Sequence, residues 1–224
     1  MASKAHRVAQ GLVGGCALLL GVTLTGCIAP QFTYVANSTA GGSNTSTYFK
    51  VPYGWHKIGD SQLTSELKTA TGSSGGGWTI AYEAGHKPTA TDFLAFGTSQ
   101  PFVFAEVGQL NSTASGQVSY DSLRDFFLPV TATTRQNDDA QGFPLTNFKQ
   151  LRDQTLKLSQ GVHGVRETYD YTYSGGTDTF DEVVLTNKAQ NVGYRPVRHC
   201  TTQCYSSDRT EINDVMSSFT IRSS

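Results

Sequence analysis

Two cysteines near the C-terminus are the residues whose spacing most directly suggests chemistry. Cys200 and Cys204 are separated by three residues, and His199 precedes the first of them. One imidazole and two thiolates on a single turn could bind zinc or copper. In an oxidising compartment the two thiols would instead pair with each other, and we favour this interpretation. The sequence therefore predicts a Cys200–Cys204 disulfide, no metal site and no cofactor, for a domain outside the cytoplasm.

Acid and base groups are present, but not in the spacing of a known active site. The chain has no H-E-x-x-H, G-x-S-x-G or S-x-x-K motif. Asp181 and Glu182 are neighbours on a predicted strand, so they should point to opposite faces. Asp138-Asp139 lies in a polar stretch that we expect to be a solvated loop. We predict a protein that is not an enzyme; the alternative is an envelope hydrolase that uses His56 or His163 with a neighbouring carboxylate.

Aromatic residues are the best candidates for a binding surface. Tyr53 and Trp55 lie at a predicted turn, and Tyr169, Tyr171 and Tyr173 alternate along one face of a predicted strand. Tyrosine combines apolar area with a polar tip, which suits a sugar, a peptide or a partner protein. The three strand tyrosines could equally form a core face beneath a helix. We give the core more weight because most aromatic stripes are core.

The N-terminal residues indicate where the protein lies. Lys4 and Arg7 precede an uncharged apolar stretch that ends at Leu24 and is too short to cross a bilayer as a helix. The residues 24–27, Leu-Thr-Gly-Cys, resemble the bacterial lipobox. This resemblance implies that Cys27 receives a diacylglyceryl group and becomes the N-terminus after cleavage. Because two acyl chains anchor a protein stably, we expect attachment to the extracytoplasmic face of the cell membrane.

Composition and charge exclude one class of partner. The chain has 17 Lys and Arg against 18 Asp and Glu, and loss of Lys4 and Arg7 with the signal peptide leaves a formal charge of −3. Such a surface gives no electrostatic reason to expect binding to nucleic acid or to anionic lipid. The expected partners are the membrane, through the lipid anchor, and an envelope protein, glycan or lipid.

Three segments are expected along the chain. Residues 1–26 are the lipoprotein signal peptide, and residues 27–47 are the lipidated N-terminus and a flexible linker rich in Ser, Thr, Asn and Gly. Residues 48–224 are one domain of ordinary size. With 12 Phe and 10 Tyr in the chain, this domain can form a β-rich core.

The elements that must position these residues alternate between strands and a few helices. Period-two patterns predict strands, and capping residues before apolar 3.6-residue patterns predict helices. Pro196 suggests that its strand has a bulge or lies at a sheet edge. The expected strands cover residues 78–85, 101–110, 151–160, 164–174, 178–188 and 192–200, and the expected helices cover residues 60–70, 89–96, 119–128 and 206–219. This order predicts an α+β domain with an antiparallel sheet flanked by helices.

Three short motifs extend this prediction to a family. Residues 48–59 (YFKVPYGWHKIG), the turn at Cys200–Tyr205 and residues 212–222 (INDVMSSFTIR) resemble actinobacterial cell-envelope lipoproteins with a PsbP-like domain. The resemblance implies an α/β/α sandwich. It transfers no catalytic residue, and it implies a binding or assembly role.

Overall fold

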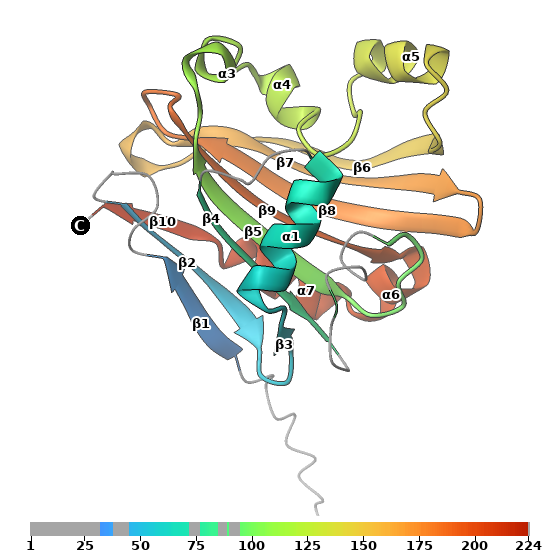
Figure 1. Cartoon of the computed structure of the whole chain (residues 1–224), viewed down its shortest axis with the longest axis horizontal. Coiled ribbons are helices and arrows are strands. Elements are labelled where there is room, and N and C mark those ends of the chain that lie inside the picture. The colour runs from blue at the N-terminus through green and yellow to red at the C-terminus, as the bar shows by residue number, and fades with distance from the viewer. Residues whose placement is uncertain (1–31, 38–44, 72–76, 85–88, 90–94, 224) are drawn as a thin grey trace, which may run out of the picture.

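The computed structural model describes residues 32–37, 45–71, 77–84, 89 and 95–223. Its main sheet has seven strands in the order β3-β4-β5-β9-β8-β7-β6, and every neighbouring pair is antiparallel (Figure 1). These strands are β3 (His56–Lys57), β4 (Gly77–Glu83), β5 (Phe102–Gln109), β6 (Thr146–Lys157), β7 (His163–Tyr173), β8 (Gly176–Thr186) and β9 (Val192–Thr201). Strand β6 is therefore an edge strand, and β8 and β9 are central.

Helices cover both faces of this sheet (Figure 1). One face packs on α1 (Asp60–Thr71), α3 (Ser112–Gly116), α4 (Tyr120–Arg124) and α5 (Ala132–Ala140). On that side Leu63 of α1 joins Phe102 and Phe104, and Leu123 of α4 joins Val165 and Val184. The prediction of an α+β domain with a helix-flanked antiparallel sheet is confirmed.

The opposite face packs on two more helices and a small second sheet. The helices are α6 (Thr202–Ser207) and α7 (Arg209–Ser217), and the second sheet has the order β1 (Phe32–Asn37), β2 (Thr45–Pro52) and β10 (Thr220–Ser223). Met216 packs with Val183 and Tyr194, while Val215 joins the strand residues Phe49 and Val103. The predicted helix over 206–219 corresponds to α7, and its first two residues belong to the separate helix α6.

The linker prediction is wrong for part of its range. Strand β1 lies inside residues 27–47, and β2 starts at Thr45 rather than Tyr48. Val35 and Asn37 are buried because β1 pairs with β2 in antiparallel register and packs on the core beside Phe49. The uncharged, Ser- and Thr-rich composition did not indicate this non-local pairing. The predicted signal peptide and the predicted lipidation site, Cys27, lie outside the described residues.

Two local predictions also need correction. Asp138-Asp139 lies on helix α5 rather than in a loop, because Thr131 caps that helix by accepting a hydrogen bond from the Thr134 amide. Pro196 lies on β9, in the interior of the sheet rather than at an edge. The β8 ladder keeps one register on both sides of it, at Glu182↔Val197 and Leu185↔Tyr194. The predicted helix 89–96 lies largely outside the described residues.

Candidate functional site

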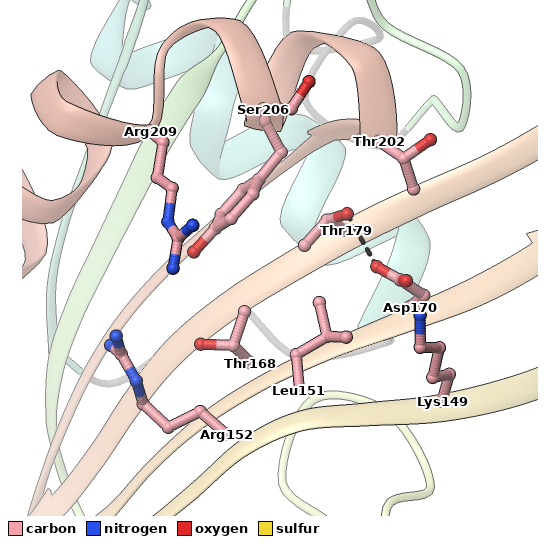
Figure 2. Close-up of a pocket in the computed structure, with 10 residues that line it drawn as sticks. Lys149, Leu151, Arg152, Thr168, Asp170, Thr179, Thr202, Ser206 and Arg209 are labelled. Atoms are coloured by element: carbon pink, nitrogen blue, oxygen red, sulfur yellow. Dashed lines mark hydrogen bonds between the residues drawn. The ribbon is translucent and has the colours of Figure 1, made fainter.

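A polar groove of about 420 Å³ lies over the sheet beside α6 and α7 (Figure 2). Strands β6, β7 and β8 form its floor. From β7 and β8, the side chains that line the groove are Thr168, Asp170 and Thr179. Helix α6 contributes Thr202, Tyr205 and Ser206 to the wall, and α7 contributes Arg209. Residues about 60 positions apart in the sequence are thereby brought to one site. We call this site the basic groove.

A β-bulge explains how strand β6 supplies two consecutive residues, Leu151 and Arg152, to the basic groove besides Lys149. Lys149 pairs with Asp170, but the register shifts between Gln150 and Arg152, and Arg152 pairs with Thr168. In a regular strand Leu151 and Arg152 would point to opposite faces. With the extra residue, Lys149, Leu151 and Arg152 all line the groove.

The groove carries excess positive charge. Lys149, Arg152 and Arg209 line it, and none of them has an ion-pair partner among the described residues. Arg152 on β6 and Arg209 on α7 reach toward the same end of the groove, and Lys149 lies at the other end with Asp170 (Figure 2). Guanidinium groups present a planar fork of donors that matches a carboxylate or a phosphate. The groove is therefore chemically suited to an anion.

The single carboxylate in the groove lining is already engaged. Asp170 accepts a hydrogen bond of 2.7 Å from the Thr179 hydroxyl and lies opposite Lys149 in the ladder. The hydroxyls of Thr168, Thr202 and Ser206 also belong to the lining. A ligand that bears an acid group at the arginine end could thus bond to hydroxyls along the rest of the groove.

A buried ion pair beneath the groove holds its floor to its wall. Asp181 of β8 is fully buried and accepts two hydrogen bonds from Arg166 of β7, of 3.0 and 2.8 Å. The Tyr205 hydroxyl of α6 donates to the same carboxylate over 3.2 Å. Arg166 also donates to Asn213 of α7. Burial and the neighbouring Asp181 charge raise the pKa of Tyr205, so its hydroxyl stays protonated as a donor.

A second buried guanidinium adds positive charge below the groove. Arg198 of β9 is fully buried and lies opposite Asp181 in the ladder. Burial lowers its pKa to about 9, against the opposing effect of Glu211 and Asp181, so Arg198 remains charged at neutral pH. The carboxylates of Glu211, Asp181 and Asp208 act on Arg198 as counter-charges. The attraction of the groove for an anion therefore rests on its lining cations rather than on the buried charges.

The predicted disulfide is present and supports this wall. Cys200 at the end of β9 is bonded to Cys204 in α6. Both cysteines are buried, while Thr202, Tyr205 and Ser206 on the same turn line the groove. Thr201 caps α6 by accepting a hydrogen bond from the Cys204 amide. The cysteines are thus structural, and among the described residues no group of three His, Cys, Asp or Glu side chains could hold a metal ion.

The predicted aromatic surface is not brought together. Tyr169 and Tyr171 are buried core residues that pack with Phe180, Val130 and Leu145, so the prediction of a binding surface is wrong for them. Their stripe faces the helix side of the sheet, as in the core alternative. Tyr173 is half-buried at the end of the same stripe.

Tyr53 and Trp55 lie elsewhere and differ in role. Tyr53 is 74% exposed. The Trp55 indole donates a hydrogen bond of 3.1 Å to Glu211, and its ring lies 5.2 Å from the Arg198 guanidinium carbon. Trp55 therefore covers a buried cation, and Tyr53 is the member of this pair that remains a surface candidate.

The histidines proposed for the hydrolase alternative have no bond to a carboxylate in the described part of the chain. The Nδ1 atom of His163 lies 3.0 Å from the Gly161 carbonyl oxygen, and its ring packs near Tyr120. His56 is exposed on the two-residue strand β3. The histidine that does face a carboxylate is the buried His199, 3.5 Å from Asp178.

Glu167 of β7 is a buried carboxyl on the opposite side of the sheet from the basic groove. Burial first, and then the neighbouring Asp153, raise its pKa to about 8, even though Arg124 lies 3.3 Å away. Arg124 is closer to Asp153, at 2.9 Å, and Gln150 donates to the other Glu167 oxygen. Glu167 is therefore protonated at neutral pH in the folded chain.

This pKa makes stability depend on pH. Between about pH 4.5 and pH 8 the folded chain holds a proton on Glu167 that the unfolded chain has lost, so stability falls as the pH rises. In Glu167→Gln the neutral form is permanent. We expect the free energy of unfolding of the wild type to fall by about 3 kcal/mol more than that of the variant between pH 5 and pH 8. Urea unfolding at both pH values measures this difference, and the exposed Asp214→Asn is the control. An equal change in the free energy of unfolding of the wild type and of Glu167→Gln would contradict the raised pKa of Glu167.

Comparisons with known proteins address the fold. The cyanobacterial PsbP of Synechocystis sp. PCC 6803 (CyanoP) superposes with a TM-score of 0.52 at 12% identity, over 91% of this chain and 99% of that one. The chain has a PsbP-like fold. The yeast Ran-binding protein Mog1p superposes over 85% of this chain with a TM-score of 0.41 and 8% identity. No protein-family model matches the sequence, and no curated protein matches it.

At 12% identity, the PsbP-like fold gives the arrangement of the elements but not the ligand. The spacing of Cys200 and Cys204 predicted the disulfide beside the basic groove, whereas no pattern in the sequence indicated the cations of the groove. Lys149, Arg152 and Arg209 stand in ordinary mixed-charge stretches, and neither the bulge in β6 nor the approach of α7 was visible there.

No helix among the described residues is long and apolar enough to span a membrane.

Proposed function

We propose that this protein is a lipid-anchored, non-enzymatic binding protein of the extracytoplasmic membrane face, and that its basic groove holds an anionic group of an envelope protein, glycan or lipid. The observation that carries the proposal is a set of three cations over a groove of about 420 Å³, none of which has an ion-pair partner in the part of the chain that the structure describes. The lipobox-like residues ending at Cys27 support the location. The Cys200–Cys204 disulfide is in keeping with an oxidising compartment.

The chemistry of the groove favours binding over reaction. Its lining contains no histidine or cysteine, and the Asp170 carboxylate is held by the Thr179 hydroxyl. Three cations and several hydroxyls can bind an anion through charge-assisted hydrogen bonds, and no nucleophile paired with a base is seen in this lining. The net formal charge of −3 expected for the mature chain argues against a nucleic-acid ligand.

Co-purification from the native host tests both parts of this proposal. The protein is extracted in detergent, alongside Arg152→Gln/Arg209→Gln and the control Lys57→Gln, which lies outside the groove. We expect an intact mass that corresponds to a diacylated Cys27 N-terminus. We also expect an anionic envelope component that accompanies the wild type and the control but not the double variant. An unmodified chain that retains Met1 would contradict the location, and equal recovery with all three proteins would contradict the groove.

A further inference from the structure

A second pocket, of about 520 Å³, lies where helix α5 meets the start of strand β6. It is separate from the basic groove and shares none of its lining residues. The residues that define its chemistry are Arg135, Asp139, Phe143, Thr146, Asn147 and Phe148. We call it the α5 pocket. Its residues include one of the two aspartates that the sequence singled out, and the buried Tyr171 closes its inner end.

Arg135 is fixed in this pocket with most of its donors unused. Its Nε donates to the Val130 carbonyl oxygen over 3.1 Å, and its guanidinium carbon lies 4.2 Å from the centre of the Phe148 ring. Its two terminal nitrogens have no hydrogen-bond or ion-pair partner among the described residues. A stacked guanidinium that is already ordered loses little freedom when it binds a carboxylate or a phosphate in bidentate fashion.

The rest of the lining favours a ring with hydroxyl groups. Two phenylalanines pack against Tyr171 and provide an apolar wall. The ring centroid of Phe143 lies 6.0 Å from that of Tyr171, and the ring centroid of Phe148 lies 5.3 Å from it. Asp139, Asn147 and Thr146 offer oxygen acceptors and donors around it. Asn147 has a left-handed backbone (φ 51°) inside a bulge of β6, which marks an irregular start to that strand. Apolar walls combined with several polar groups match the C–H faces and the hydroxyls of a sugar ring.

The carboxylate of Asp139 restricts the charge of the ligand. It lies in the same pocket as Arg135, and both act on the Tyr171 hydroxyl, whose pKa burial raises to about 12. A ligand with several adjacent negative charges would be repelled by Asp139, whereas hydroxyl groups can donate to it. One acid group beside several hydroxyls satisfies both residues.

We propose that the α5 pocket binds an acidic sugar residue, with its carboxylate or phosphate on Arg135 and its hydroxyls toward Asp139 and Asn147. This site does not depend on the basic groove.

Titration of the full-length protein followed by NMR tests this site. The probes are glucuronate, glucose 6-phosphate, glucose and inorganic phosphate. We expect glucuronate or glucose 6-phosphate to bind at least tenfold more tightly than glucose or inorganic phosphate, and the tighter of the two identifies the acid group. Equal binding of inorganic phosphate would overturn the sugar assignment. Equal binding of glucose would overturn the role of Arg135, and no binding by any probe would overturn the site.

Variants assign the binding to its residues. Arg135→Gln should weaken the tighter probe at least tenfold. Arg135→Lys keeps the charge but loses the planar fork, so it should weaken the tighter probe severalfold and measures the contribution of the fork alone. The exposed Asp139→Ala should weaken the sugar probes but not inorganic phosphate. The groove variant Arg152→Gln/Arg209→Gln should bind the sugar probes as the wild type does; a loss in that variant that Arg135→Gln does not reproduce would place the binding in the basic groove and overturn the α5 pocket.

Discussion

Asp181→Asn should lower the free energy of unfolding by about 3 kcal/mol. The carboxylate is fully buried and accepts from Arg166 twice and from Tyr205 once. Removal of its charge leaves Arg166 without its carboxylate partner and removes one of the carboxylates that act on the buried Arg198. Water cannot solvate the buried guanidinium that loses its partner. The free energy of unfolding therefore falls far more than it does when a surface ion pair is removed. Urea unfolding monitored by circular dichroism measures the change.

The matched control for this variant is Asp153→Asn. Asp153 also pairs with an arginine, Arg124, at 2.9 Å, but its side chain is 41% exposed. We expect a cost below about 1 kcal/mol for the control. Asp181→Asn should also weaken anion binding in the basic groove, because Tyr205 loses its anionic partner. Similar costs for the two variants would show that the Asp181 network does not stabilise the floor of the groove.

The double variant Cys200→Ser/Cys204→Ser should lower the free energy of unfolding by about 2 kcal/mol, the chain-entropy value for so short a loop. Its larger effect should be on the basic groove, where we expect anion affinity to fall at least fivefold. The disulfide joins β9 to α6, and α6 carries Thr202, Tyr205 and Ser206. Without the disulfide, this turn has more conformational freedom in the unbound protein. Part of the binding free energy is then needed to order the turn, so the affinity falls.

Reduction of the wild type and one further variant serve as controls. Treatment with dithiothreitol should reproduce the loss of affinity seen in the double variant. Gln203→Ala lies between the two cysteines, is exposed and does not line the groove, so it should bind as the wild type does. If the double variant retained full affinity, the wall of the groove would not depend on the disulfide, and α6 would be held by Asp181 and its own cap alone.

The sequence was sufficient for the elements whose signals are local. Strands β7 and β8 are rich in residues that favour strands and are joined by a Gly-Gly turn. The helix signal at residues 206–219 lies where α7 and the end of α6 form. Asp181 and Glu182 do point to opposite faces, toward Arg166 and Tyr169 respectively. The disulfide followed from residue type and spacing.

Features that depend on distant residues could not be predicted in this way. Strand β1 has a linker-like composition and becomes ordered only by pairing with β2. Pro196 lies on an interior strand because the ladder to β8 continues on both sides of it. The basic groove joins a bulge in β6 to the first residue of α7, and no periodicity in either segment indicates the other. The tyrosine stripe was recognised, but only the packing of Val130 and Leu145 shows that two of its members are core.

The most direct test of the basic groove is an NMR titration of the protein with glycerol 1-phosphate at 20 mM and 200 mM salt. We predict that the amide signals of Thr168, Tyr205 and Arg209 shift on binding, that affinity falls at the higher salt concentration, and that Arg152→Gln/Arg209→Gln abolishes these shifts. Shifts that the double variant leaves unchanged, or groove amides that do not move at millimolar probe, would contradict the claim that this groove binds anions.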